Sequence, residues 1–572
     1  MKPGEVAAAR FGLACVALYA GLLVLYWPSL SFRPLSLDDL GQLQAAAQQS
    51  LAQIFAPDRY GHLRPVKSAL FWLLAHSPEP WIALRASLLA VLLVATVLVQ
   101  RLAARLTGSR AVGLMVAACW ALNPTTATVT CWLSAANIAL CLIGVLVYLE
   151  CASRRLDPAL GPALASSPAR ARGWLVLALS SLALALASHE LAVTAPLLLW
   201  AHERLLAPRG RAGGTRSVYL GSACVVLLFG ALVLVAGRSQ VEYRFGAEPA
   251  WLISFSAARY LGQNALLWLL PAGRFGVLLG DRPAEHMIAS GAAWVMLIAA
   301  AVLLWRQRGR DPVLGFGLVW SGVLLAPVAN LVPLGNTPIA MHYAYLPGVG
   351  LSLALVAVLH ALARRVARGR AGAECALMSV LFAGLGAYWL PQSARAVRAW
   401  GDEEPLFAAT VADYPGEIEP LVNLASVYLD RQRYDRAAAT LERARAVDPE
   451  DLGVVRNRFS LFWQTGQIEA ALAVLDGQPR AAQRPEFQLG RGQALARLGR
   501  WPEAVVALQR AFDSDSTAID RELRFAAGYQ LLVALLQSGR RGEAERIFDR
   551  VLAEYPERDE LRVVRQVLRG AP

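Results

Sequence analysis

The sequence predicts an all-α protein, in which a polytopic membrane bundle of about eleven spans precedes a soluble superhelix of tetratricopeptide repeats. Hydrophobic residues make up 56% of the 572 residues and charged residues only 17%, whereas a soluble globular protein carries roughly 25% charged residues. Apolar stretches long enough to cross a bilayer recur through residues 1–391, and the chain becomes charged and helically periodic after Trp400. These observations exclude a soluble enzyme and a disordered chain.

Eleven apolar segments are candidate membrane spans. They are 11–30, 81–104, 110–123, 132–151, 173–188, 190–206, 217–236, 288–305, 313–329, 344–363 and 373–391. Arginine clusters lie beside alternate segments, and basic residues collect in cytoplasmic loops. Every cluster faces the cytoplasm if the shorter apolar segment 258–270 does not cross. The N-terminus is then cytoplasmic and the repeats lie outside, whereas a crossing segment would return the repeats to the cytoplasm. The same loops account for the net charge of +13, so we expect no nucleic-acid partner.

The chain after the membrane domain matches a 34-residue repeat pattern. The first repeat, 418–451, has small or apolar residues at the expected positions, namely Leu421, Leu424, Ala425, Tyr428, Ala437, Leu441 and Ala444, followed by Pro449. A degenerate repeat at 452–484 and further repeats at 485–518 and 525–558 follow, with a capping helix at 558–569. Residues 392–417 resemble a connecting half-repeat. Stacked helix pairs form a concave groove, which we expect to hold a protein or peptide partner.

Two acidic residues follow the first span. Asp38 and Asp39 could supply a general base, because neighbouring like charge raises the pKa of one carboxylate. The alternative is a helix start that Ser36 caps, with both acids in its first turn. These residues belong to the first outer loop, 31–80. In the same loop, Arg64 could bind a phosphate through its planar guanidinium, or it could contact a lipid headgroup.

Further polar residues lie at the expected outer ends of later spans. Asn123 precedes a proline, which indicates a plain helix break. His189 and Glu190 join two spans with almost no loop, so they could relay a proton or bind a metal, or form a capped turn. The outer loop 237–287 contains several arginines, including Arg244 and Arg259, that suit a phosphate or could pair with nearby acids. Finally, His342 and Tyr343 begin a span, where a single histidine is more often structural. The paired acids, the arginines and the His-Glu pair all lie at one expected membrane face, and this convergence suggests a site for an anionic, lipid-linked substrate.

These motifs, in this order, resemble the transmembrane and tetratricopeptide-repeat-containing protein O-mannosyltransferases of the type C glycosyltransferase superfamily, over nearly the whole chain. The matching segments are Leu37-Asp38-Asp39, Leu63-Arg64-Pro65-Val66 with Trp81, Asn123-Pro124 with Trp132 and Asn137, His189-Glu190, Asn330-Leu331, Tyr343-Ala344-Tyr345-Leu346-Pro347, and Trp400 with Phe407. Two positions depart from the family pattern. Met341-His342 stands where the family has Glu-Arg, and His189 stands where it has Lys.

The resemblance implies that a sugar moves from a polyprenyl-phosphate donor to an acceptor on the outer membrane face, with inversion. Asp38 or Asp39 is the expected base for the acceptor hydroxyl, and cationic groups stabilise the departing phosphate. The candidate phosphate ligands are Arg64, Arg244, Arg259 and His342. Glu190 is expected to assist catalysis by orienting the acceptor or supporting the reacting groups. Further candidates for contact with the acceptor or with the reacting groups are His189, Asn123 and Tyr343.

The composition, rich in arginine, alanine and leucine, suggests a GC-rich bacterium. The expected location is then the inner membrane, with the repeats in the periplasm and undecaprenyl as the carrier. Asp38, Asp39 and Glu190 could hold a divalent metal, although acidic residues alone do not specify one. Two other functions fit the same sequence. One is a non-catalytic scaffold that assembles an envelope complex, and the other is an enzyme that glycosylates a lipid or polysaccharide.

Overall fold

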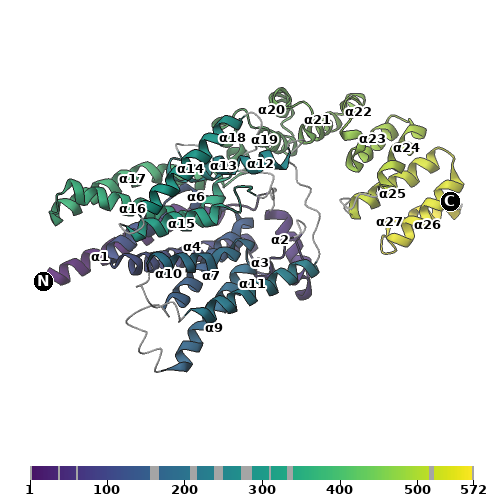
Figure 1. Cartoon of the computed structure of the whole chain (residues 1–572). Helices are drawn as coiled ribbons and strands as arrows, with labels where there is room; N and C mark the ends of the chain where they lie inside the picture. The colour runs from purple at the N-terminus through teal and green to yellow at the C-terminus, as the bar shows by residue number, and fades with distance from the viewer. Residues whose placement is uncertain are drawn as a thin grey trace. The chain divides into compact units, whose positions relative to one another are not determined.

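The computed structural model describes residues 3–35, 39–58, 62–154, 167–206, 215–236, 249–271, 286–307, 311–331, 339–514 and 521–569. Within these residues the chain forms α-helices and short 3-10 helices and contains no β-strand, which confirms the predicted all-helical class (Figure 1). The chain divides into two compact units, Met1–Tyr414 and Pro415–Pro572. The candidate site lies entirely within the first unit.

The first unit is a bundle of long apolar helices joined by short helical segments. Its α-helices are α1 (Pro3–Tyr26), α2 (Asp39–Gln48), α3 (Pro65–Ala75), α4 (Pro80–Thr107), α5 (Arg110–Ala121), α6 (Pro124–Cys131), α7 (Ala136–Ser153), α9 (Pro168–Leu186), α10 (Ala195–Leu205), α11 (Arg216–Ala236), α12 (Ala250–Phe255), α13 (Ala257–Leu269), α14 (Met287–Gln307), α15 (Pro312–Leu325), α16 (Pro347–Val366), α17 (Ala371–Ala399) and α18 (Glu403–Asp413). The 3-10 helices are η1 (Trp27–Ser31), η2 (Leu51–Phe55), η3 (Leu133–Ala135), η5 (Glu190–Thr194) and η7 (Met341–Ala344).

Seven helical segments of the described chain are long and apolar enough to cross a membrane, and the pair α5–α6 would make an eighth despite a 62° bend. The apolar parts of α14 and α15 are shorter. The predicted span 190–206 consists of η5 followed by α10, which begins at Ala195 with Pro196 in its first turn. Helix α13 has 13 residues, fewer than the roughly 20 that a span needs. The chain is therefore compatible with a multi-pass membrane protein, while the count of eleven stays a prediction.

Several of these helices expose their apolar side chains. Only 11% of the span in α11 is buried inside the protein, and the same is true of α17. On α11, Leu227 is 73% exposed and Val235 is 86% exposed. Apolar surfaces of this extent are rare on soluble monomers, whereas hydrocarbon tails cover them without cost. This exposure is compatible with a lipid bilayer around the first unit.

The bent pair α5–α6 contains the helix break that was predicted at Asn123. The chain turns at Asn123 and Pro124 and continues as a second helix, whose eight residues are all buried. Asn123 caps this helix, because its Oδ1 accepts hydrogen bonds from the backbone N–H of Thr125 at 3.0 Å and from its hydroxyl at 2.8 Å. Its Nδ2 donates to the carbonyl of Trp268 at 2.9 Å. The helix carries the chain into η3 and α7, which form part of the candidate site.

Helix α4 carries a polar cluster near each of its ends. Near its start, Arg85 is buried and donates to the backbone carbonyls of Phe32, Arg33 and Cys131. Near its end, Arg105 lies 3.2 Å from Glu150, which also pairs with Arg154 at 2.8 Å. A helix rises 1.5 Å per residue, so Arg85 and Arg105 are about 30 Å apart, close to the thickness of a bilayer core. The two clusters therefore lie at opposite ends of the bundle.

The second unit is an array of helix pairs. Its helices are α19 (Ile418–Asp430), α20 (Tyr434–Val447), α21 (Leu452–Gln464), α22 (Ile468–Asp476), η8 (Ala481–Gln483), α23 (Pro485–Arg497), α24 (Trp501–Phe512), α25 (Arg521–Gln537), α26 (Arg541–Glu554) and α27 (Glu560–Arg569). The small residues named in the repeat pattern sit where helices approach closely. In the repeat 485–518, a side chain at Gly492 would meet Leu508 Cγ at 2.4 Å, so α23 and α24 pack closely at this glycine.

Candidate functional site

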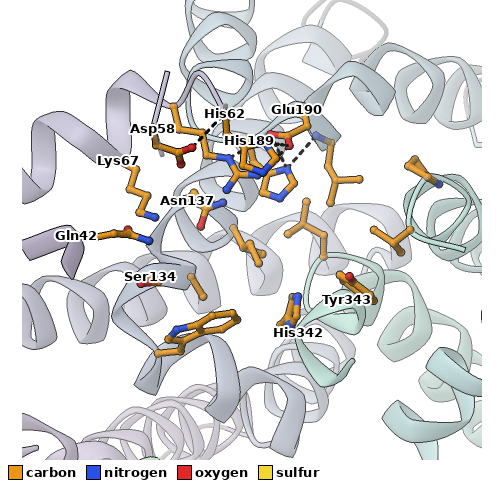
Figure 2. A pocket seen from close by; sticks show the side chains of 18 of the residues that line it. Gln42, Asp58, His62, Lys67, Ser134, Asn137, His189, Glu190, His342 and Tyr343 are labelled. Atoms are coloured by element: carbon orange, nitrogen blue, oxygen red, sulfur yellow. Dashed lines mark hydrogen bonds and ion pairs between the residues drawn. The ribbon is translucent and has the colours of Figure 1, made fainter. Parts of the chain in front are cut away.

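A cavity of about 590 Å³ opens among the segments that carry the predicted polar motifs (Figure 2). Residues from α2, α3, η3, α7, η5 and η7 line it, together with residues 327–330. These segments are far apart in the sequence and meet only in the folded chain. Five predicted site residues line this one cavity, namely Arg64, His189, Glu190, His342 and Tyr343. Asn330, which belongs to the family-like pattern, lines it as well.

Arg64 and Glu190 form a two-point ion pair at the cavity wall. Arg64 Nη2 donates to Glu190 Oε1 at 2.8 Å, and Arg64 Nε donates to Oε2 at 3.3 Å. His62 Nδ1 lies 3.4 Å from the same Oε1. Partial desolvation opposes the charge of Glu190, but its cationic partner Arg64 favours that charge, and the pKa of the carboxyl lies below its usual value. Because paired hydrogen bonds fix the plane of a guanidinium, Glu190 orients Arg64 in the cavity.

His189 acts as a cap rather than as a charged partner of Glu190. Its Nδ1 accepts a hydrogen bond from the backbone N–H of Leu191 at 3.1 Å, at the start of η5. A nitrogen that accepts this bond carries no proton, so its 3.5 Å approach to Glu190 is not an ion pair. Burial lowers the pKa of His189 to about 4. The capped turn that the sequence allowed for this motif is therefore present.

Asp39 is completely buried and lies outside the cavity lining. Its Oδ1 accepts hydrogen bonds from the backbone N–H and the hydroxyl of Ser134, at 2.9 and 2.8 Å. Burial raises its pKa above the usual value. Ser134 itself lines the cavity, so Asp39 fixes the position of a lining residue without lining the cavity itself. Asp38 and Ser36 lie outside the described residues.

The remaining predicted residues do not join the cavity. Arg259 on α13 is buried and donates to Ser290 at 3.2 Å and to Gln263 at 3.3 Å, away from the cavity lining. Asn123 uses its amide inside the protein, as described above. Arg244 lies outside the described residues.

Aromatic side chains form another part of the wall. The ring of His342 lies edge-on to Trp132, with centroids 5.3 Å apart, and contacts Tyr343 at 4.4 Å. Trp132 also stacks on Trp400 at 5.6 Å. Burial lowers the pKa of His342 to about 3, so its imidazole is neutral near pH 7. In that state the side chain offers hydrogen-bonding nitrogens and a ring surface, without a positive charge.

Several lining residues had not been singled out from the sequence. They are Gln42, Asp58, His62, Lys67 and Ser134, whereas Asn137 had been named only within the family-like pattern. Lys67 follows Arg64 by three residues and therefore shares its helix face. A single lysine in the apolar helix α3 was a usable signal for it. The described lining carries two cationic groups, Arg64 and Lys67, and two carboxylates, Asp58 and Glu190.

The described residues do not fit the divalent metal that the acids could hold. Within the described part of the chain, no group of three or more histidines, cysteines, aspartates or glutamates is placed to bind a metal ion. Asp39 directs one oxygen to Ser134 and is buried. Glu190 directs both oxygens to Arg64. We therefore assign no step to a metal.

The buried histidines predict a loss of stability in mild acid. In the unfolded chain His189 and His342 take up protons near pH 6.5, whereas in the folded chain their pKa values are about 4 and about 3. As pH falls from 7 to 4.5, only the unfolded state gains these protons, so the free energy of unfolding falls. The pKa of Glu190 is also lowered, but its contribution is lost only below its unfolded pKa, near 4.5.

These two shifts correspond to a loss of up to about 5 kcal/mol over this range. The midpoint of thermal unfolding of the detergent-solubilised chain, measured from pH 7 to pH 4.5, checks it. His342→Gln removes one of the titrating groups and should reduce the slope. An equal slope in wild type and variant would contradict the assignment to His342.

Comparison with known families adds one finding, on the second unit. Residues 429–498 match the tetratricopeptide repeat family. This match covers α20 to α23 with flanking residues, and it confirms the predicted repeat type for that segment. No curated protein matches the chain. Many tetratricopeptide repeats bind polypeptides along a concave face.

Proposed function

We propose that this protein is a membrane glycosyltransferase, which moves a sugar from a polyprenyl-phosphate donor to an acceptor hydroxyl, with inversion. The observation that carries the proposal is the meeting of three separate predicted motifs, Arg64, His189-Glu190 and His342-Tyr343, at one cavity. Asp39 of the acidic motif adjoins the same cavity, because it is bonded to the lining residue Ser134. A protein hydroxyl is the proposed acceptor, since the tetratricopeptide match gives the chain a means to bind polypeptides.

The proposed base is Asp38. A general base must come within hydrogen-bond distance of the proton that it removes. Asp39 is 0% exposed, so an acceptor cannot reach it, and of the two acids only Asp38 is left for this role. Asp39 then positions the segment, through its bonds to Ser134.

The leaving group is a polyprenyl phosphate, whose negative charge needs a cation. Arg64 is the proposed ligand, and its pairing with Glu190 supports this role by fixing the guanidinium before the donor arrives. Lys67, one turn further on α3, supplies a second positive charge at the same wall. In the reaction the acceptor oxygen bonds to the anomeric carbon, the bond from that carbon to the phosphate oxygen breaks, and Asp38 takes the hydroxyl proton.

Glu150 pairs with Arg101, Arg105 and Arg154 at one end of α4. Arg85, near the other end of α4, donates to the carbonyl of Cys131, and the next residue, Trp132, lines the cavity. The cavity therefore lies at the end of the bundle opposite this Glu150 cluster. Basic residues mark the cytoplasmic side. We therefore assign the cavity to the outer face of the bacterial inner membrane and the repeats to the periplasm, as expected for an undecaprenyl-linked donor.

Intact-mass glycoproteomics of envelope proteins tests the function. The comparison uses three strains: wild type, a deletion strain without the chain, and the deletion strain complemented with the chain from a plasmid. We expect at least one envelope protein to lose a glycan mass without the chain and to recover it on return. Unchanged masses across the three strains would rule out transfer to protein.

A second candidate is a non-catalytic scaffold for an envelope complex, which the tetratricopeptide match favours. In that case the glycan masses stay constant. The envelope proteins that co-purify with the chain would instead lose their association with one another in cells without the chain. Transfer to a lipid or polysaccharide would instead change extracted glycolipids and leave protein masses constant.

A further inference from the structure

The cavity contains a buried side chain that the proposed reaction does not yet use. Asn137, the second residue of α7, is 3% exposed and lines the cavity. Its amide forms no hydrogen bond within the described chain, and its polar atoms are not sealed inside the protein. A buried amide without partners costs about 1–3 kcal/mol. Its partners must therefore be molecules that enter the cavity.

Two other buried asparagines show that this arrangement is unusual in the fold. Asn123 donates to Trp268 and accepts from Thr125, and Asn264 donates to the carbonyl of Tyr260 at 2.9 Å and accepts from the backbone N–H of Ala340 at 3.2 Å. Both amides join segments of the bundle. Asn137 joins none, so its role is not to hold the described elements together.

Gln42 on α2 provides a second free amide at the same cavity. It too lines the cavity and forms no hydrogen bond within the described part of the chain. Figure 2 shows Gln42, Lys67 and Asn137 projecting toward the same part of the cavity, from three different elements. Two neutral amides therefore line the same cavity as the cationic groups that would bind the donor phosphate.

The chemistry of these groups fits hydroxyls. A side-chain amide offers two N–H donors and one carbonyl acceptor, which is the set that a pair of neighbouring hydroxyls can satisfy. An ionised ligand would be better matched by charged groups. The ring of Trp132, also in the lining, adds an apolar surface of the kind that packs against a flat ligand. In a polyprenyl-phosphate sugar, the hydroxyl-bearing group next to the phosphate is the sugar.

We infer that Asn137 and Gln42 form the subsite that recognises the hydroxyls of the donor sugar. This inference rests on the proposed function, because it assumes a polyprenyl-phosphate donor. The two residues bind the sugar, whereas Arg64 and Lys67 bind the phosphate. A site built to bond hydroxyls discriminates strongly against ligands that lack them. Asn137 and Gln42 therefore set which sugar is transferred.

Binding to the full-length chain in lipid nanodiscs tests the subsite. The probes are undecaprenyl phosphate alone and undecaprenyl phosphate that carries mannose, glucose, galactose or N-acetylglucosamine. In the wild type, at least one sugar-bearing lipid should bind about tenfold more tightly than the bare lipid, which corresponds to one or two net hydrogen bonds. Asn137→Leu should remove this difference and keep the affinity for the bare lipid within about twofold.

Two further variants keep the test independent of folding defects. Gln42→Leu, on a different helix, should reduce the same difference, and Gln44→Leu serves as its control because Gln44 is exposed on the same helix. If the sugar makes no difference in the wild type, or if Asn137→Leu and Gln42→Leu leave the difference intact, the subsite is wrong while the proposed donor stands. If no polyprenyl phosphate binds at all, the proposed function fails and the subsite fails with it.

Discussion

Replacing Asp38 with Asn should lower the rate of sugar transfer at least a hundredfold and leave the thermal stability of the chain unchanged. The amide cannot accept the proton of the acceptor hydroxyl, and a positioned general base contributes about 10²–10⁴ to a rate. The measurement is the initial rate of transfer from the sugar-bearing lipid that binds the wild type, with the chain in nanodiscs. Donor affinity should stay close to that of the wild type, because the base does not hold the phosphate.

Asp39→Asn is the matched control, since it makes the same chemical change one residue away. Asn can still accept the hydrogen bonds from Ser134 through its Oδ1. Its new NH₂ group, however, replaces Oδ2, which is buried and without a hydrogen-bond partner in the described chain. We expect a loss of about 1–3 kcal/mol in stability and a smaller loss of rate than for Asp38→Asn. A rate that survives Asp38→Asn but vanishes in a stably folded Asp39→Asn would reverse the assignment.

The fold could be predicted from the sequence where its signal is local. Apolar segments with a period of 3.6 identify helices without any knowledge of their neighbours. The repeats are equally local, because each repeat carries its own pattern, and residues 429–498 match the family model. Helix α6 was missed for the opposite reason. Its eight residues, Pro124–Cys131, have no apolar stripe, and only burial on all sides makes them a helix between two spans.

The candidate site was predictable as a set of residues but not as a set of contacts. Arg64 and Glu190 were both singled out, yet their pairing joins residues 126 positions apart, and no pattern in one sequence reports such a contact. Likewise, Asp38 and Asp39 are chemically identical, and only packing shows that Asp39 is buried. Arginine at position 85 gave no signal, because it stands at the start of an apolar helix where arginine usually reaches lipid headgroups.

Arg85→Met should be the most destabilising single substitution in the first unit that we can argue from its contacts. The guanidinium donates to the carbonyls of Phe32, Arg33 and Cys131, at 2.8, 3.0 and 2.7 Å, and is 1% exposed. Methionine has a similar length and an apolar side chain, but it donates no hydrogen bond. The substitution therefore leaves three carbonyls without this donor, and it removes the positive charge that favours ionised Asp39. We expect a loss on the order of 3–5 kcal/mol.

The thermal unfolding midpoint of the detergent-solubilised chain measures this loss, and it should fall by roughly 5 °C or more. Arg101→Met, on the same helix, is the matched control. The Arg101 side chain is 61% exposed and approaches Glu150 only at 3.9 Å, so its removal should cost less than about 1 kcal/mol. Because Cys131 directly precedes Trp132 in the cavity lining, Arg85→Met should also weaken donor binding. Equal midpoints for the two variants would show that Arg85 does not anchor the end of the bundle that carries the cavity.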